Sequence, residues 1–296
     1  MIAETGALQR GRDDLIEPGA HPSFEWLGAT AERRLQPVLL TVPHAGRFIP
    51  QCDRDRAIVP LAALASLSDP LVDSLAYDAA RAGHDVLVAQ LSRAHLDLNR
   101  APGDVDAAAC EGSPRRHGCP RVRGGIGLVP TRIAGVRALW ARPLSRAELD
   151  RRLRTYHAPW HLTIATSLAE RRARFGAAVL LDLHSCPSRS GVADIVIGNR
   201  HGASAGEGVT SLLEELVRGR GFSVARNRPY AGAYSLTRHA APGRGIHAVQ
   251  IEVRRDLYLT SDGTLGAGAS RVSSLIVEMA DAVSAHVADV APLAAE

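Results

Sequence analysis

The amino-acid sequence predicts an α/β fold, a three-layer sandwich in which a central mixed, largely parallel sheet is flanked by helices. Apolar, β-rich segments alternate with helical segments along the chain. The segments 37–43, 177–183 and 245–253 are almost continuously apolar, as strands buried on both faces are. Short motifs with polar and charged residues lie at the end of these runs or just after them. This position places reactive side chains at the carboxyl edge of the sheet, where open α/β sheets bind ligands.

The elements of the first half of the chain follow in order. The strand at 37–43 leads to a helical segment at about 60–82, which ends on Gly83 because glycine commonly terminates helices. Pro70 interrupts this segment, so a second helix is expected to begin there. The next strand is predicted at 85–91.

The second half repeats the alternation. A long helical pattern runs from Ser145 to Phe175. Ser145 and Glu148 form a capping box at its start, and Pro159 is expected to kink or split it. Beyond the strand at 177–183, the sequence predicts strands at 192–198, 222–227 and 245–253, and helices at 206–221 and about 266–290.

We expect a single catalytic domain over residues 1–296, because 46% of the chain is hydrophobic and no linker divides it. Residues 1–35 are polar and lack a sustained period, which predicts a peripheral N-terminal extension, with order beginning near Pro37. Residues 101–135 are rich in Gly, Pro and Arg and predict a long insertion loop near the site, of the kind that forms lids or stays mobile.

Composition argues against several functions. The net charge is only +4, the 35 basic residues are all scattered arginines, and aromatic residues make up 4%, which disfavours nucleic-acid binding. No run reaches the roughly 20 apolar residues that span a bilayer, and the N-terminus lacks the apolar core of a secretory signal. The four cysteines show no CxxC spacing. We therefore expect a cytoplasmic protein with reduced thiols and no membrane partner, and a homo-oligomer stays open.

Two histidines lie where predicted strands end. His44 follows the strand at 37–43, and His184 follows the strand at 177–183. Imidazole nitrogens and a carboxylate are usual zinc ligands, so the pair predicts a metal site. Asp182 is a candidate for orienting the imidazole of His184. The alternative for each histidine is a hydrogen bond to the backbone.

Two kinds of carboxylate complete the predicted chemistry. Asp69 is our choice as the third metal ligand, with Asp73 as an alternative, although Asp69 could instead cap the helix that begins at Pro70. Glu252 lies in an otherwise apolar strand, where a carboxylate is costly without a role. That role would be general base and then general acid. A strand-end glutamate paired with Arg254 or Arg255 is equally compatible with the sequence.

Asn99 and Arg100 could clamp a substrate carboxylate through an amide donor and a guanidinium fork. Arg93 and Asp97 are close enough in sequence to brace that clamp, and a plain surface turn is the alternative. Tyr230, in a glycine-containing loop, is expected to form a pocket wall or to pack beneath the loop.

Taken together, the sequence motifs that contain these residues resemble those of the N-formylglutamate amidohydrolase family. The matching stretches are TVPHAGRFIP, SLSDPLVDSL, LSRAHLDLNRAPGD, YHAPWHL, LLDLHS, DIVIGNRHG and NRPYAGAYSLTRHAAPGRGIHAVQIEVRRDLY, in order over most of residues 40–258. The family is distantly similar to zinc carboxypeptidases and aspartoacylases, which carry comparable words in the same order.

The resemblance implies a zinc ion at His44 and His184, carboxylate binding by Asn99 and Arg100, and Glu252 as the base. Carboxypeptidases take their second ligand from an H-x-x-E word, but the third residue after His44 is Arg47, which cannot bind a cation. The family pattern suggests Asp69 in its place. His161 matches the family without an assigned role.

The resulting hypothesis is a zinc-dependent amidohydrolase that cleaves N-formyl-L-glutamate, a small anionic N-acyl amino acid, to formate and L-glutamate during histidine degradation. Arg93 is a candidate for stabilising the oxyanion, and Arg254 for reaching the second substrate carboxylate. Two rivals remain: a related enzyme with a different acyl specificity, and a non-catalytic binder of an acidic metabolite.

Overall fold

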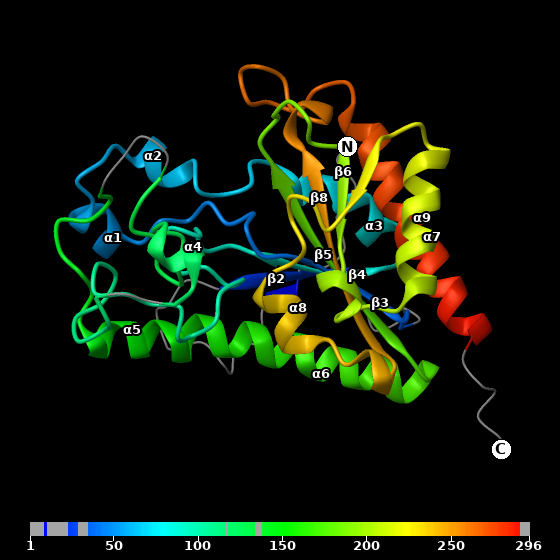
Figure 1. Ribbon diagram of the computed structural model, residues 1–296, viewed down its shortest axis with the longest axis horizontal. Helices are drawn as coiled ribbons and strands as arrows, with labels where there is room; N and C mark the ends of the chain where they lie inside the picture. The colour runs from blue at the N-terminus through cyan, green and yellow to red at the C-terminus, as the bar shows by residue number, and fades with distance from the viewer. Residues whose placement is uncertain (1–8, 11–22, 29–34, 116–117, 134–137, 291–296) are drawn as a thin grey trace.

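The computed structural model describes residues 9–10, 23–28, 35–115, 118–133 and 138–290. They form an eight-stranded mixed sheet with helices on both faces, so the predicted three-layer α/β sandwich is confirmed (Figure 1). The strand order is β1-β2-β4-β3-β5-β8-β6-β7. The strands are β1 (Gln9–Arg10), β2 (Phe24–Leu27), β3 (Val38–Val42), β4 (Asp85–Ala89), β5 (Ala178–Cys186), β6 (Ile195–Gly198), β7 (Val224–Arg226) and β8 (Ile246–Arg254).

The centre of the sheet is parallel. Strands β4, β3, β5 and β8 run in the same direction, whereas β2 and β6 are antiparallel to β4 and β8. The helices and helical turns are α1 (Gln51–Arg56), α2 (Leu61–Ala65), η2 (Val72–Leu75), α3 (Tyr77–Ala82), α4 (Pro120–Arg123), α5 (Arg146–Arg152), η3 (Leu153–His157), α6 (Ala158–Phe175), η4 (Arg200–Gly202), α7 (Glu207–Gly219), α8 (Tyr234–His239), η5 (Pro242–Arg244), η6 (Arg255–Leu257) and α9 (Ala269–Val290).

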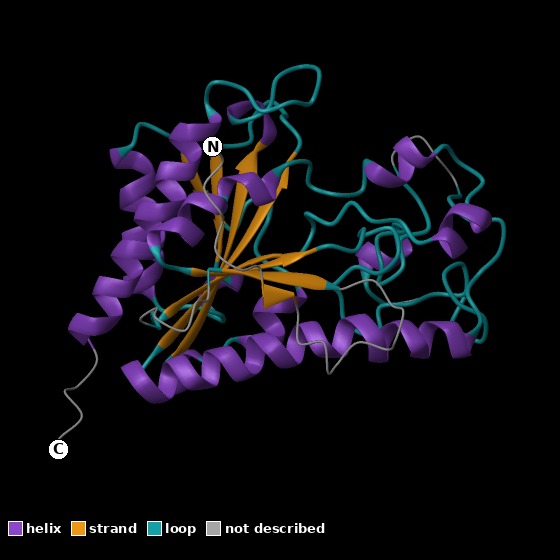
Figure 2. Cartoon of the chain, turned by 180° about the vertical axis from the view of Figure 1, so that it is seen from behind, coloured by secondary structure: helices purple, strands orange, loops and turns teal. Residues whose placement is uncertain are grey.

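Side-chain alternation along the strands divides the core into two layers. In β5, Val179, Leu181 and Leu183 pack in the layer that contains α3, α7 and α9. Ala178 and Leu180 face the other way, toward α6 and α8. Figures 1 and 2 show these two helical layers on opposite faces of the sheet. Since strand side chains alternate, the residues after Leu180 on the second face are Asp182 and His184.

The long helical segment predicted from Ser145 to Phe175 differs from the prediction at Pro159. The chain stays helical from Arg146 to Phe175, and a π-helical turn, η3, lies just before Pro159. A proline clashes with the carbonyl four residues earlier, and the wider π-turn relieves that clash without splitting the helix. The predicted cap is present, because the Ser145 hydroxyl accepts a hydrogen bond from the Glu148 amide at 3.2 Å.

The segment around Pro70 also differs from the prediction, because no helix begins at Pro70 itself. Helix α2 ends at Ala65, and a loop leads to η2 and α3. The Asp69 amide donates to the His44 carbonyl at 2.9 Å, and the Ser68 hydroxyl donates to the Gly46 carbonyl at 3.0 Å. Gly46 itself lies against the backbone at Leu91, where any Cβ atom would clash. The loop that carries Asp69 is thus fixed beside the end of β3.

Both strands that residues 1–35 contribute to the sheet, β1 and β2, were not predicted from the sequence. We expected order to begin near Pro37, but Phe24–Leu27 form β2, which pairs with β4 in an antiparallel register. Contact with α6 stabilises this segment, because the Phe24 ring packs edge-on against Trp160 of α6 with ring centroids 5.7 Å apart. Four residues give too short a pattern for a period to be recognised. The rest of the predicted extension lies largely outside the described residues.

The insertion is an ordered lobe rather than a bare loop, in the parts that the structure describes (101–115 and 118–133). Val105, Leu128 and Val129 form a small core of their own with Leu144 and Tyr156. This lobe lies beyond the sheet, over the α5 end of the long helix (Figure 1).

A buried ion-pair network ties α1 to the long helix. Asp53 accepts hydrogen bonds from His95 Nδ1 at 2.6 Å and from Arg152 Nη2 at 2.8 Å. Arg56 Nη2 lies 3.3 Å from the same carboxylate. All four side chains are buried.

We expect Asp53→Asn to lower the free energy of unfolding by about 3–5 kcal/mol, because it leaves the buried Arg56 without its carboxylate and Arg152 with Glu148 as its remaining partner. Urea denaturation would measure the change. Asp150→Asn, which breaks an exposed pair with Arg146, is the control and should stay within about 0.5 kcal/mol of the parent. Equal denaturation midpoints for the two variants would contradict the role of the network.

Candidate active site

Polar side chains gather at the carboxyl edge of the sheet. The register pairs Asp182 with Gln250 and His184 with Glu252 across β5 and β8. On the other side of β5, Thr41 pairs with Asp182, and its hydroxyl donates to that carboxylate at 2.6 Å. All of these side chains lie on the α6 face, where the apolar pattern of the strands has ended.

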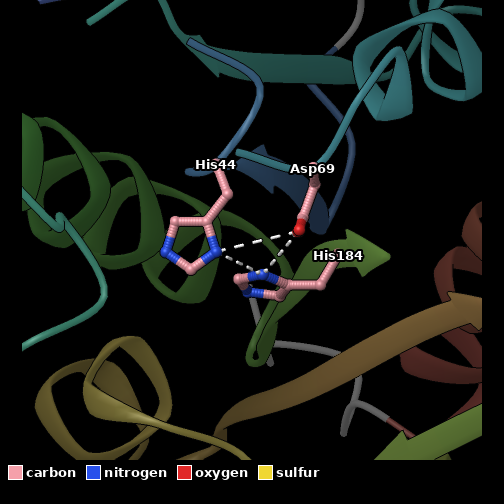
Figure 3. Close-up of side chains that lie close together, drawn as sticks. All are labelled: His44, Asp69 and His184. Atoms are coloured by element: carbon pink, nitrogen blue, oxygen red, sulfur yellow. Dashed lines mark hydrogen bonds and ion pairs between the residues drawn. The ribbon is translucent and has the colours of Figure 1, made fainter. Parts of the chain in front are cut away.

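His44, Asp69 and His184 converge on one point (Figure 3). The two Nδ1 atoms of His44 and His184 lie 3.1 Å apart. Asp69 Oδ2 lies 3.7 Å from His44 Nδ1 and 3.5 Å from His184 Nδ1. All three side chains are buried. The three candidate ligands predicted from the sequence are therefore brought together.

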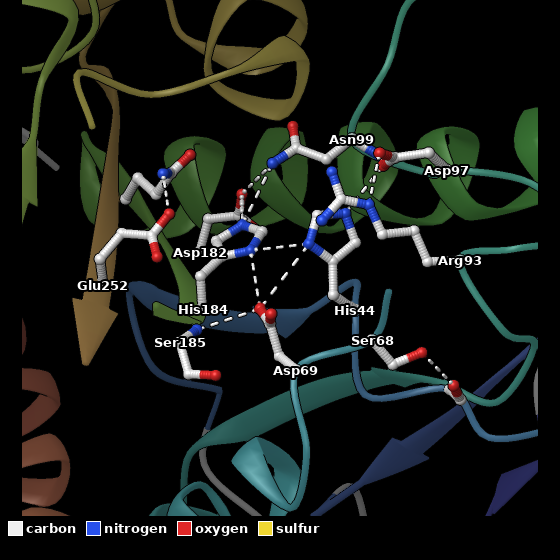
Figure 4. A network of polar contacts seen from close by, with 12 residues as sticks. His44, Ser68, Asp69, Arg93, Asp97, Asn99, Asp182, His184, Ser185 and Glu252 are labelled. Atoms are coloured by element: carbon white, nitrogen blue, oxygen red, sulfur yellow. Dashed lines mark hydrogen bonds and ion pairs between the residues drawn. The ribbon is translucent and has the colours of Figure 1, made fainter. Parts of the chain in front are cut away.

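The outer nitrogen of each imidazole is held by a carboxylate (Figure 4). His44 Nε2 contacts Asp97 Oδ1 at 2.8 Å, and His184 Nε2 contacts Asp182 Oδ2 at 2.9 Å. Since an ionised carboxylate only accepts, each Nε2 carries a proton and each Nδ1 faces the shared point. Carboxylates behind the outer nitrogens are the usual arrangement around metal-binding histidines.

Negative charge is in excess at this point. Burial alone would lower the pKa of His184, but the charge and hydrogen bond of Asp182 raise it to about 10. Burial raises the pKa of Asp69, yet its hydrogen bonds with His184 and His44 bring it well below its usual range. Both shifts follow from buried carboxylates beside imidazoles, an environment that favours a cation at this point.

Asp69, rather than Asp73, is the carboxylate at this point. Asp69 Oδ2 accepts a hydrogen bond from the Ser185 amide at 3.0 Å, and its Oδ1 lies 3.0 Å from Arg255 Nη2. Asp73 instead pairs with Arg47 at 2.6 Å. The alternative role of Asp69 as a helix cap is wrong, because the cap residue of η2 is Leu71 and no side chain caps it.

Glu252 is buried at the same edge. Its Oε1 accepts a hydrogen bond from Gln250 Nε2 at 2.7 Å. Burial raises the pKa of Glu252 to about 7, while the charge of His184 lowers it. The alternative in which Glu252 pairs with Arg254 or Arg255 is wrong, because Arg254 pairs with Asp194 and Asp256, and Arg255 pairs with Asp69. A carboxyl group that titrates near neutrality can both accept and return a proton.

A cavity of about 490 Å³ opens over these groups. Its basic lining consists of Arg93, Arg100, Arg121, Arg132 and Arg255. Arg93 and Arg255 are paired with Asp97 and Asp69. The described residues contain no carboxylate partner within 4.0 Å of Arg121 or Arg132, both of which come from the insertion lobe. The cavity therefore suits an anionic ligand.

Asn99 lines the cavity, but its side chain already has protein partners. Its Nδ2 donates to Asp182 Oδ2 at 3.4 Å, and its Oδ1 accepts from the Ser235 amide at 2.8 Å. Arg254 does not line the cavity, because Asp194 and Asp256 hold its guanidinium. Its neighbour Arg255 lines the cavity instead. Tyr230 and Arg100 line it as predicted.

The donor set fits a divalent metal ion such as zinc. Two imidazole nitrogens and one carboxylate oxygen, with a cavity on the open side, match the three protein ligands of catalytic zinc sites. A second group of potential ligands, Cys52, Asp53 and His95, fits poorly. There, Asp53 is already neutralised by Arg152 and Arg56.

Imidazoles backed by carboxylates, next to a buried carboxyl group that titrates near neutrality, give this α/β protein the equipment of a hydrolase. Comparison with known proteins identifies the family. The family model for N-formylglutamate amidohydrolase matches residues 36–259. The chain therefore belongs to the N-formylglutamate amidohydrolase family.

Individual relatives agree with this assignment. The chain is 28% identical over 233 residues to N-formylglutamate deformylase from Pseudomonas aeruginosa, covering 75% of this chain and 82% of that protein. It is 29% identical, with the same coverage, to N-formylglutamate deformylase from Pseudomonas putida. The crystal structure of N-formylglutamate amidohydrolase from Ralstonia eutropha JMP134 matches with a TM-score of 0.80 and 29% identity, covering 90% of this chain and 98% of that one.

In the part of the chain that the structure describes, no helix combines the length and the apolar character needed to cross a membrane.

Proposed function

We propose that this protein hydrolyses the formyl amide bond of N-formyl-L-glutamate to give formate and L-glutamate. Family membership and the deformylase relatives support this reaction. The observation that carries it is the convergence of His44 Nδ1, His184 Nδ1 and Asp69 Oδ2 at a cavity with several arginines in its wall.

In this proposal, His44, Asp69 and His184 would hold one divalent metal ion, for which zinc is our choice. Such an ion supplies Lewis-acid polarisation of the formyl carbonyl and of the attacking water. Glu252 takes one proton from that water as its oxygen adds to the formyl carbon. Glu252 then returns the proton to the amine nitrogen as the carbon–nitrogen bond breaks. Arg93, which lines the cavity, is our candidate for stabilising the oxyanion.

The substrate carries two carboxylates, and the cavity offers guanidinium groups for both. Arg100 is nearly buried and is held by the Ile126 and Asn99 carbonyls at 2.9 and 2.7 Å, so its position is fixed in advance. We assign one carboxylate to Arg100. Arg121 and Arg132 also line the cavity and are assigned the second carboxylate, the role first considered for Arg254. Tyr230 would form part of the pocket wall.

The products, formate and L-glutamate, suit the final step of histidine degradation, and we extend the proposal to that pathway and to a cytoplasmic location. An initial-rate panel tests the specificity. N-formyl-L-glutamate should give a kcat/KM at least about tenfold above N-formyl-L-glutamine, because loss of a charge-assisted hydrogen bond costs about 1.5–3 kcal/mol. Equal rates for N-acetyl-L-glutamate or a larger acyl group would favour a different acyl specificity. Binding of N-formyl-L-glutamate without turnover of any substrate would favour a non-catalytic binder.

The pH dependence follows from Glu252. A general base must be ionised, so kcat/KM should fall with a slope of one as the pH drops through the pKa of Glu252. Burial raises that pKa to about 7 from the usual 4.5, and a bound cation would lower it, which places the acidic limb between these values. A profile from pH 4 to 9 would measure the limb, and a flat profile down to pH 4.5 would exclude Glu252 as the base.

A further inference from the structure

Two buried histidines that the proposed reaction does not use lie directly beneath the turn 97–100. His157 is the last residue of the π-turn η3, and His161 lies one turn further along in α6. Four residues apart on a helix, they share one face, and their ring centroids are 4.3 Å apart. Neither histidine lines the cavity, so neither is placed to touch a substrate.

Both imidazoles bond to the backbone of that turn. His161 Nε2 donates to the Leu98 carbonyl at 3.0 Å, and His157 Nε2 donates to the Arg100 carbonyl at 2.9 Å. These two carbonyls flank Asn99. The turn is therefore held from below at two points, one on either side of the residue that faces the site.

Side chains of the same turn also interact with the groups that orient the two candidate metal-binding histidines. Asp97 accepts from His44 Nε2 at 2.8 Å. Asn99 Nδ2 donates to Asp182 Oδ2, the carboxylate behind the His184 ring, at 3.4 Å. One four-residue turn thus sets the orientation of two imidazoles, that of His44 directly and that of His184 through Asp182.

The hydrogen-bond directions in this layer are fixed. Because a carbonyl oxygen only accepts, His161 carries its proton on Nε2 and its Nδ1 is an acceptor. His239 Nε2 in α8, 2.8 Å away, must then be the donor to it. Burial lowers the pKa of His161, as do its histidine neighbours, which keeps the ring neutral. The Ser235 amide, also in α8, fixes the Asn99 oxygen at 2.8 Å.

We propose that His161 and His157 are positioning residues, which hold the turn 97–100 so that Asp97 and Asn99 fix the imidazoles of His44 and His184 for a divalent metal ion. This rests on the metal site of the proposed function. Loss of a group that orients a metal-binding imidazole typically lowers the metal affinity by about 10- to 100-fold.

The test is Zn²⁺ affinity, measured on the full-length metal-free protein by competition with a chromophoric chelator. His161→Leu should weaken Zn²⁺ binding by about 10- to 100-fold. His161→Gln should recover most of that loss, because its amide can donate to Leu98 and accept from His239. The activity of His161→Leu should rise toward the parent value as Zn²⁺ is added, whereas a loss of general structure would not respond to zinc.

The pair His157→Leu and His157→Gln repeats the comparison at the Arg100 carbonyl if His161→Leu does not fold. His84→Gln alters a buried histidine that bonds to Asp281, away from the site, and should bind Zn²⁺ like the parent. Folded leucine variants with parental Zn²⁺ affinity would overturn the proposal. Parental protein that binds Zn²⁺ tightly but does not cleave N-formyl-L-glutamate would overturn the proposed substrate and leave this inference intact.

Discussion

Glu252→Gln is expected to lower kcat for N-formyl-L-glutamate by about 10²- to 10⁴-fold, the usual contribution of general acid–base catalysis. The amide has nearly the same shape as the carboxylate but cannot take a proton from the attacking water. Because Glu252 is not one of the three converging ligands, the variant should keep its metal content, and KM should change much less than kcat.

Glu214→Gln is the matched control, since Glu214 is as buried as Glu252 (each is 7% exposed) but pairs with Arg226 and Arg218 on the far side of the sheet. Its kcat should stay within a few-fold of the parent. A folded, metal-loaded Glu252→Gln protein with parental kcat would remove Glu252 from the mechanism. The raised pKa would then reflect burial alone.

His184→Ala is expected to abolish both metal binding and turnover. The side chain supplies one of three converging atoms, and it lies near the carboxyl end of β5 between Asp69 and Asp182. Removing a ligand should weaken binding by more than the roughly 10- to 100-fold caused by loss of an outer partner. Metal content by mass spectrometry and kcat/KM on the same preparation measure both effects.

Circular dichroism must show that the His184→Ala variant is folded, since the mutation also leaves Asp182 without its imidazole partner. His286→Ala, on α9 and remote from the sheet edge, is the control for loss of a histidine. Full zinc content in folded His184→Ala would mean that the ion, if any, binds elsewhere.

The fold was accessible from the sequence because its central strands are buried on both faces. Continuous apolar runs, such as Val38–Val42 and residues 178–181, are typical of parallel strands buried on both faces and predict them directly. Strand β2 was not accessible, because four residues give no usable period. The continuity of the helix through Pro159 depends on a π-turn that no local sequence rule predicts.

The candidate site was accessible where a polar residue lies near the carboxyl end of an apolar strand, as His44 after β3 and His184 in β5 do. The sequence could not distinguish Arg254 from Arg255, because adjacent arginines differ only in the direction that the backbone gives them after β8. It also could not reveal that Asn99 is committed to Asp182 and Ser235, since those partners lie 83 and 136 positions away. Arg121 and Arg132 were noticed only as part of an arginine-rich insertion.

The measurement that tests the account most directly is anomalous X-ray diffraction at the zinc absorption edge, on crystals of active protein. We predict one peak within about 2.0–2.2 Å of His44 Nδ1, His184 Nδ1 and an Asp69 oxygen. No peak at that point in crystals of fully active protein, or a single peak beside Cys52, Asp53 and His95 instead, would contradict the account.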